Sequence, residues 1–156
     1  MEKFLITLMC TLMLIMQGCA SQTQHQGNQA IMEIQARAEH AYKLAMMDQA
    51  ESLYLEVLRS VPNYAPGWFR LGNIYTRTGR QDAAIAAYQR CIELEPDNQK
   101  AWYNMSLVRL KQSAQVLEIA QQHGDTSSVV HRQIKALLQA IYELQREPNN
   151  PEQAAR

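Results

Sequence analysis

The sequence predicts an all-α fold, a short solenoid of helical hairpins. Three observations carry this prediction. In residues 65–98, aromatic and aliphatic side chains recur at intervals of three and four, as on one face of an amphipathic helix. Part of that pattern returns one repeat length earlier and one repeat length later. Glycine and proline fall where such helices would end.

The central unit, residues 65–98, predicts two helices joined by a turn. Trp68, Leu71 and Tyr75 are three and four residues apart and share one face of the first helix. Gly79 suits the turn because glycine tolerates left-handed backbone, and Pro96 ends the second helix. We expect the structural core of the units to contain Ala50, Tyr54, Trp68, Leu71, Gly72, Tyr75, Ala84, Tyr88, Pro96 and Trp102.

The spacing W-x2-L-G-x2-Y in this unit, followed by an alanine, a tyrosine and a proline, resembles the tetratricopeptide repeat family. The resemblance covers residues 31–112 and is densest in residues 65–98. It implies a scaffold of about 2.5 repeats that holds another protein. A generic helical bundle is the alternative, and under both interpretations the aromatic stripe is core.

Residues 31–64 read as a divergent first repeat. Ala50, Tyr54 and Pro62 stand one repeat length before Ala84, Tyr88 and Pro96.

A third repeat begins at residue 99, where Trp102 matches Trp68, but its second half departs from the pattern. Neither glycine nor proline occurs between Lys100 and His123, so we expect one long helix over about residues 98–122, with Asp97 or Asn98 at its cap.

A last helix over residues 126–145 is expected to cover the end of the solenoid. Gly124 stops the preceding helix, and Asp125, Thr126 or Ser127 would cap the new one. Its apolar stripe consists of Val130, Ile134, Leu137, Leu138 and Ile141. The polar tail, residues 146–156, is expected to be disordered.

The N-terminus resembles a bacterial lipoprotein signal. Residues 1–18 combine a short apolar core with Gly18 directly before Cys19. The resemblance implies cleavage and lipidation at Cys19, and Ala20 in the next position implies the periplasmic face of the outer membrane. Residues 19–30 would form a flexible tether. A plain secretory signal and an uncleaved anchor are the alternatives.

The composition excludes several classes of function. Lys plus Arg and Asp plus Glu both number 15, which argues against a nucleic-acid partner. Cys91 reads as a small buried apolar residue, so we expect no intramolecular disulfide once Cys19 is lipidated. The histidines are scattered, and no phosphate loop or metal-ligand spacing occurs, so we expect no enzyme, metal or cofactor.

A binding groove is predicted along the first helix of each hairpin, as the family resemblance implies. The inward positions mix amides, aromatics and a few cations, which suits an extended or helical peptide of some acidic character. The family's clamp for a terminal carboxylate is absent, since only Lys100 fits it. The convex face or the final helix is the alternative site. The predicted groove residues are Gln35, Glu39, Tyr42, Phe69, Asn73, Thr76, Arg77, Lys100, Tyr103, Asn104, Leu107 and Lys111.

Together these features predict an outer-membrane lipoprotein that acts as a protein scaffold. It resembles the small repeat lipoproteins of pilus and secretion machines, including type IV pilotins and those of tight-adherence (Flp) pili. One rival is an adaptor that docks periplasmic hydrolases or proteases onto substrates. Another is an enzyme with a site near His123 and His131. A homodimer through an incompletely covered apolar end is a further alternative.

Overall fold

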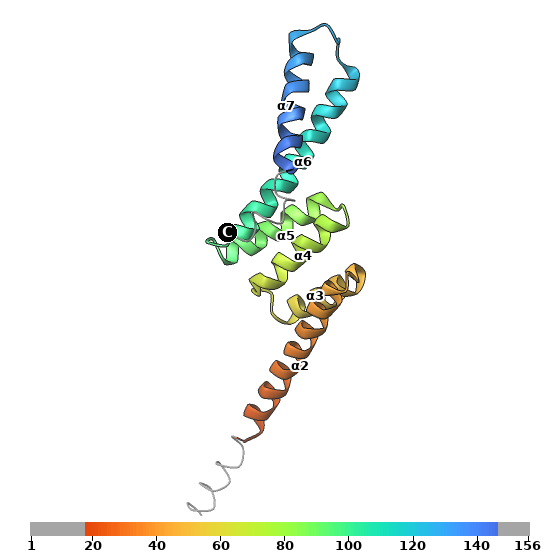
Figure 1. The fold of residues 1–156 in the computed structure, drawn as a ribbon. Coiled ribbons are helices and arrows are strands. Elements are labelled where there is room, and N and C mark those ends of the chain that lie inside the picture. The colour runs from red at the N-terminus through yellow and green to blue at the C-terminus, as the bar shows by residue number, and fades with distance from the viewer. Residues whose placement is uncertain (1–17, 147–156) are drawn as a thin grey trace, which may run out of the picture. The chain divides into compact units, whose positions relative to one another are not determined.

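The structure, a computed structural model, describes residues 18–146, and the side chains of residues 28–144 (Figure 1). Within that range the chain forms helices and no strand, so the predicted all-α helical-repeat class is confirmed. The signal segment before Gly18 and the tail after Arg146 lie outside the described residues. The helices are α2 (Gly18–Lys43), α3 (Met47–Ser60), α4 (Ala65–Arg77), α5 (Gln81–Leu94), α6 (Gln99–His123) and α7 (Val129–Arg146).

The chain divides between Pro62 and Asn63 into two compact units. In the first unit, α2 and α3 form a hairpin whose small buried residues, Ala38, Ala41 and Ala50, let the two helices approach closely. Tyr54 is buried beside them, and its hydroxyl donates a hydrogen bond of 2.8 Å to Glu39 Oε2. The core positions predicted for α3 are therefore confirmed.

The segment predicted as a flexible tether is helical instead. Helix α2 begins at Gly18 and runs without interruption through residues 19–30. The segment lacks proline, and its glutamines are good helix formers, so it can extend the helix that packing on α3 fixes further along. A polar composition without periodicity predicts a lack of burial, but it does not exclude a helix.

The second unit opens with the α4–α5 hairpin. Gly72 lies directly under the Tyr88 ring, so close that a Cβ atom at residue 72 would be 2.4 Å from Tyr88 Cε1. Gly79 forms the turn with φ of 76°, which an L side chain rarely adopts. Leu71 and Ala84 are buried, as predicted. The spacing in this unit therefore encodes a close helix crossing.

Helix α6 is continuous from Gln99 to His123, as the lack of glycine and proline predicts. The Asn98 side chain caps it by accepting a hydrogen bond of 3.1 Å from the Ala101 backbone N–H. Its N-terminal half packs on α5 through Ala101, Met105 and Val108. Its C-terminal half packs on α7, and the two helices run side by side (Figure 1).

Two residues predicted for the core of the solenoid, Trp102 and Pro96, are exposed instead. Trp102 is 48% exposed, and its indole N–H donates a hydrogen bond of 2.9 Å to the backbone oxygen of Pro96, which is itself at the surface. The reason is the length of α6, because α7 packs on Ala114 and its neighbours instead of covering Trp102. Trp68 and Tyr75, which keep a covering helix, are half-buried.

The start and the stripe of α7 also differ from the prediction. Ser128 caps the helix, since its hydroxyl accepts a hydrogen bond of 3.0 Å from the His131 backbone N–H. Asp125 instead accepts hydrogen bonds from the backbone N–H and hydroxyl of Ser127 and shapes the preceding turn. Of the predicted stripe, Ile134, Leu138 and Ile141 pack on α6. Val130 and Leu137 are exposed.

Candidate peptide-binding groove

The strongest candidate site is an open groove of about 460 Å³ between α4 and the start of α6. The repeat positions predict all of its lining residues except Gln99, which is the first residue of α6 and lies four positions before Tyr103. The residues that line the groove are Phe69, Gln99, Lys100, Tyr103 and Asn104.

A hydrogen-bonded network lies beside the groove and fixes its amide side chains. Asn73 Oδ1 accepts one hydrogen bond of 2.8 Å from the buried Tyr88 hydroxyl and another of 2.9 Å from Asn104 Nδ2. Thr76 Oγ1 lies 3.1 Å from the Tyr88 hydroxyl and donates to the Gly72 backbone oxygen. Asn73, predicted as a contact residue, is therefore also a structural link between α4, α5 and α6.

Aromatic and cationic groups give the groove its chemical character. Phe69 packs against the Tyr88 ring, with 6.0 Å between ring centroids, while Tyr103 is 52% exposed. Lys100 stands in the first turn of α6, where no acidic residue occurs. Because a helix N-terminus carries partial positive charge, Lys100 adds to a field that favours a carboxylate there.

The structure does not bring all the predicted groove residues together. Thr76 and Arg77 end α4, and Leu107 and Lys111 lie further along α6, and none of them lines the groove. Gln35, Glu39 and Tyr42 belong to the first unit, which is described by itself. There Glu39 is engaged by the Tyr54 hydroxyl and lies 3.8 Å from Lys43 Nζ.

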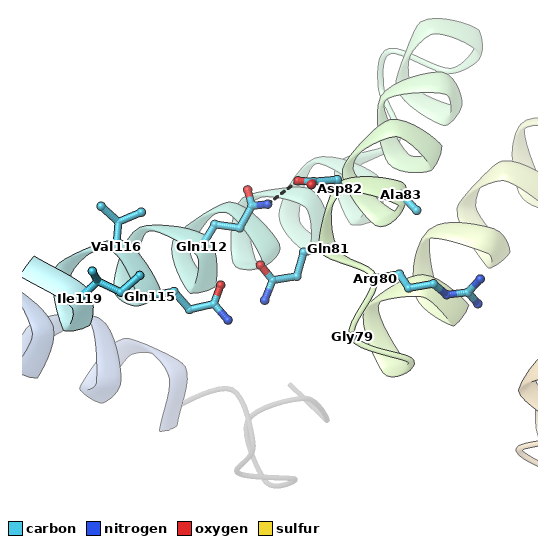
Figure 2. Close-up of a pocket in the computed structure, with 9 residues that line it drawn as sticks. All are labelled: Gly79, Arg80, Gln81, Asp82, Ala83, Gln112, Gln115, Val116 and Ile119. Carbon is cyan, nitrogen blue, oxygen red and sulfur yellow. Dashed lines mark hydrogen bonds between the residues drawn. The ribbon is translucent and has the colours of Figure 1, made fainter.

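A second, larger concavity of about 900 Å³ was not predicted (Figure 2). It arises because α6 extends past the α4–α5 turn, which leaves Val116 and Ile119 exposed on the extension. Gln112 Nε2 donates a hydrogen bond of 2.7 Å to Asp82 Oδ1 in its wall. The residues lining it are Gly79, Arg80, Gln81, Asp82, Ala83, Gln112, Gln115, Val116 and Ile119.

The two histidines suggested for a catalytic site, His123 and His131, lie on either side of the turn between α6 and α7. His123 ends α6 at the surface, while His131 lies in the first turn of α7 with a buried Nδ1 atom that has no hydrogen-bond partner. Two hydrogen bonds from Ser127 lower the pKa of the nearby Asp125 carboxyl, and the charge of His131 lowers it further. No group of three potential metal ligands occurs among residues that the structure describes.

Burial suppresses the ionisation of Cys91, the one cysteine whose side chain is described. Cys91 is fully buried in α5, and desolvation, followed by the negative charge of Glu95, raises its pKa to about 11. Its thiol therefore stays protonated and unreactive at neutral pH. This agrees with the prediction that Cys91 is an apolar core residue.

Among the described helices, none has the length and apolarity needed to cross a bilayer.

Comparison with known proteins supports the repeat. The model of the tetratricopeptide repeat family matches residues 65–98, the α4–α5 hairpin with its flanks. Residues 65–98 are a tetratricopeptide repeat. The repeat is a protein-interaction module, which points to a non-catalytic role in protein–protein interaction.

Three curated relatives are peroxisomal targeting signal receptors of yeasts. The Candida albicans protein is 27% identical over 63 residues, which is 40% of this chain and 11% of that protein. The Pichia angusta protein is 29% identical over 63 residues, also 40% and 11%. The Yarrowia lipolytica protein is 33% identical over 61 residues, 39% of this chain and 10% of that protein. The chain thus spans about a tenth of the length of these relatives.

Proposed function

We propose that this protein is a scaffold that holds a short segment of a partner protein in the groove between α4 and α6. The observation that carries the proposal is the lining of that groove. Exposed aromatic surface from Tyr103, a cation from Lys100 and an amide from Asn104 converge on one open cavity. Convergent polar groups on an aromatic surface are typical of peptide recognition.

The amide network supports recognition of a peptide backbone. Asn73 does not line the groove, and its Oδ1 accepts two hydrogen bonds, one of them from Asn104. Asn104 donates through Nδ2, so its Oδ1 is the atom that can accept. Asn73 therefore holds Asn104 in place, and Asn104 Oδ1 is available to accept a hydrogen bond from a peptide N–H in the groove.

The charge of the groove selects the segment. Lys100 makes no ion pair with the residues described here, and it adds to the positive end of α6. We therefore expect an acidic side chain or a carboxylate next to an apolar residue in the bound segment. The yeast relatives are named as receptors for a targeting signal, which supports recognition of a short segment by this kind of repeat.

For the location we propose a lipid anchor at Cys19 that holds the protein at the periplasmic face of the outer membrane. Support comes from the apolar segment before Gly18, the Gly18–Cys19 pair and Ala20 after it. The partner would then be a component of an envelope machine such as a pilus or secretion system. An adaptor for periplasmic hydrolases would use the same groove, and the identity of the captured partner separates the two.

Affinity capture from intact envelopes tests the groove. The variant Lys100→Glu with Tyr103→Ala reverses the charge and removes the exposed ring without touching the Asn73 network. We expect one specific partner with the wild type and at least a tenfold loss with this variant. Lys111→Glu is the matched control, because it reverses an exposed lysine of α6 outside the groove. Equal capture by both variants would refute the groove as the site.

Metabolic labelling with a palmitate analogue tests the anchor. We expect the wild-type chain to carry label and the Cys19→Ser variant to carry none. Cys10→Ser, which removes the other N-terminal cysteine, should label normally. Label retained by Cys19→Ser, or absent from the wild type, would show that Cys19 is not a lipid anchor.

A further inference from the structure

Tyr88 is a buried residue that reaches the groove in two ways. It is 1% exposed, and its ring packs on Phe69, which lines the groove, with 6.0 Å between ring centroids. Its hydroxyl donates a hydrogen bond of 2.8 Å to Asn73 Oδ1. Asn104, which lines the groove, donates to the same oxygen over 2.9 Å. We call this chain of hydrogen bonds, from Tyr88 through Asn73 to Asn104, the amide relay.

The Tyr88 hydroxyl selects the orientation of the Asn73 amide. The two orientations of an asparagine amide differ by a half turn, which exchanges its acceptor oxygen for its donor nitrogen. Two donors, the Tyr88 hydroxyl and Asn104 Nδ2, converge on Asn73, so only the orientation with Oδ1 between them satisfies both. The Tyr88 ring is held in place, because it is buried directly over Gly72.

The orientation of Asn73 in turn fixes what Asn104 presents to a ligand. Because Asn104 Nδ2 is bound to Asn73, the atom left for a partner segment is Oδ1, an acceptor. An acceptor selects a donor, and the donor that every residue except proline carries on its backbone is the N–H. The groove therefore discriminates against a segment with proline at the residue that meets Asn104.

We propose that Tyr88 is a positioning residue for ligand binding. Its hydroxyl, acting through Asn73, holds Asn104 with Oδ1 toward the bound segment and makes the groove selective for a backbone N–H at that point. This inference rests on the proposed peptide-binding function of the groove. The packing of the core does not require the hydroxyl, because a phenylalanine ring at residue 88 would fill nearly the same volume.

The amide relay is tested first without a ligand, by hydrogen exchange of asparagine side chains in the isotopically labelled full chain in detergent. The Asn104 amide signal is the one that disappears in Asn104→Ala. Tyr88→Phe keeps the ring and removes the hydroxyl, so the Asn104 amide protons should exchange about fivefold faster. Asn73→Leu should have at least the same effect. Asn73→Asp, which keeps an oxygen for both donors, should preserve the slow exchange.

Binding is then measured with a peptide probe, selected on the wild-type chain from a random phage-displayed library and retained only if Lys100→Glu weakens it. We expect Tyr88→Phe to weaken this peptide about fivefold. Ile92→Val is the matched control, because it removes one methyl group from the same helix and core and leaves the amide relay intact. The affinity of Ile92→Val should equal that of the wild type.

Backbone methylation of the same peptide tests the selection for an N–H. Methylation of one particular backbone nitrogen should weaken binding to the wild type about tenfold, because it leaves Asn104 Oδ1 without its donor. The same methylation should have little effect on binding to Asn104→Ala, which has no acceptor at this point.

Different results would overturn this inference and the proposed function. Equal affinity of Tyr88→Phe and Ile92→Val for the peptide, or an Asn104 exchange rate that Asn73→Leu leaves unchanged, would refute the positioning role while the groove stands. A peptide that tolerates methylation at every backbone nitrogen would refute the selection for an N–H. A library that yields no peptide weakened by Lys100→Glu would refute the groove as a binding site, and the positioning role with it.

Discussion

Replacement of Gly72 by alanine should destabilise the second unit, although alanine is the better helix former. The new Cβ atom would lie 2.4 Å from Tyr88 Cε1 and 2.5 Å from Tyr88 Cδ1. The ring cannot swing away freely, because Tyr88 is 1% exposed and its hydroxyl donates a hydrogen bond to Asn73. The substitution therefore displaces either the ring or the whole of α5.

The expected magnitude follows from three terms. Overpacking of a close-packed core costs about 1–3 kcal/mol. A weakened hydrogen bond between Tyr88 and Asn73 costs about 1 kcal/mol more. In the opposite direction, the change from glycine to alanine inside a helix stabilises the folded state by about 1 kcal/mol. The net loss in free energy of unfolding for Gly72→Ala is therefore about 1–3 kcal/mol.

Urea unfolding followed by circular dichroism measures this loss, and a double-mutant cycle isolates its cause. In a Tyr88→Leu background the ring is gone, so Gly72→Ala should become neutral or stabilising by up to about 1 kcal/mol. That change of sign is the specific signature of contact between the two positions. A neutral or stabilising Gly72→Ala in the wild-type background would refute the reasoning.

Two further predictions concern burial. Trp68→Ala should cost about 3 kcal/mol in urea unfolding, whereas Trp102→Ala should cost less than half of that, because Trp102 is 48% exposed; equal losses would show that a helix covers Trp102 in solution. Burial and Glu95 raise the pKa of Cys91 from 9.0 to about 11, so the unfolded thiol ionises first as the pH rises. The resulting stabilisation is present below pH 9 and declines as the pH rises towards 11, with about 2 kcal/mol lost by pH 10.5. Urea unfolding at pH 8 and pH 10.5 should show this loss in the wild type and not in Cys91→Ala, and equal pH dependence would contradict it.

The sequence predicts the elements whose determinants are local. The close crossing of α4 and α5 follows from a glycine and a tyrosine at fixed positions of one repeat, Gly72 and Tyr88. The unbroken α6 follows from the lack of glycine and proline, and its cap at Asn98 from a side chain next to the helix start. Helix α6 and its cap depend on adjacent residues, and the crossing depends on a fixed spacing within one repeat.

The sequence predictions fail where the spacing of residues identifies the apolar face of a helix but not the neighbouring helix that packs on it. Trp102 has the spacing of a core residue, yet the covering helix is displaced along α6 because α6 runs beyond the length of one repeat. The same displacement leaves Val130 and Leu137 uncovered on α7. Periodicity in a single helix carries no information about the register of its neighbour.

The candidate groove shows the same division between features set by the repeat pattern and features set by helix packing. Repeat position alone predicts Phe69, Lys100, Tyr103 and Asn104, which line one cavity in the structure. The structural role of Asn73 was not predictable, because its hydrogen bonds to Tyr88 and Asn104 link α4 to two other helices and no spacing in the repeat specifies them. Contacts of that range depend on how three helices pack together.

The central claim, that the groove between α4 and α6 holds a segment of a partner protein, is tested most directly by photocrosslinking in living cells. A photoreactive phenylalanine analogue replaces Tyr103 in the groove or Gln139 on the far side of α7, both exposed. We expect one defined protein adduct from position 103 that disappears when Lys100→Glu is added, and no matching adduct from position 139. The same adduct from position 139 with none from position 103 would contradict it.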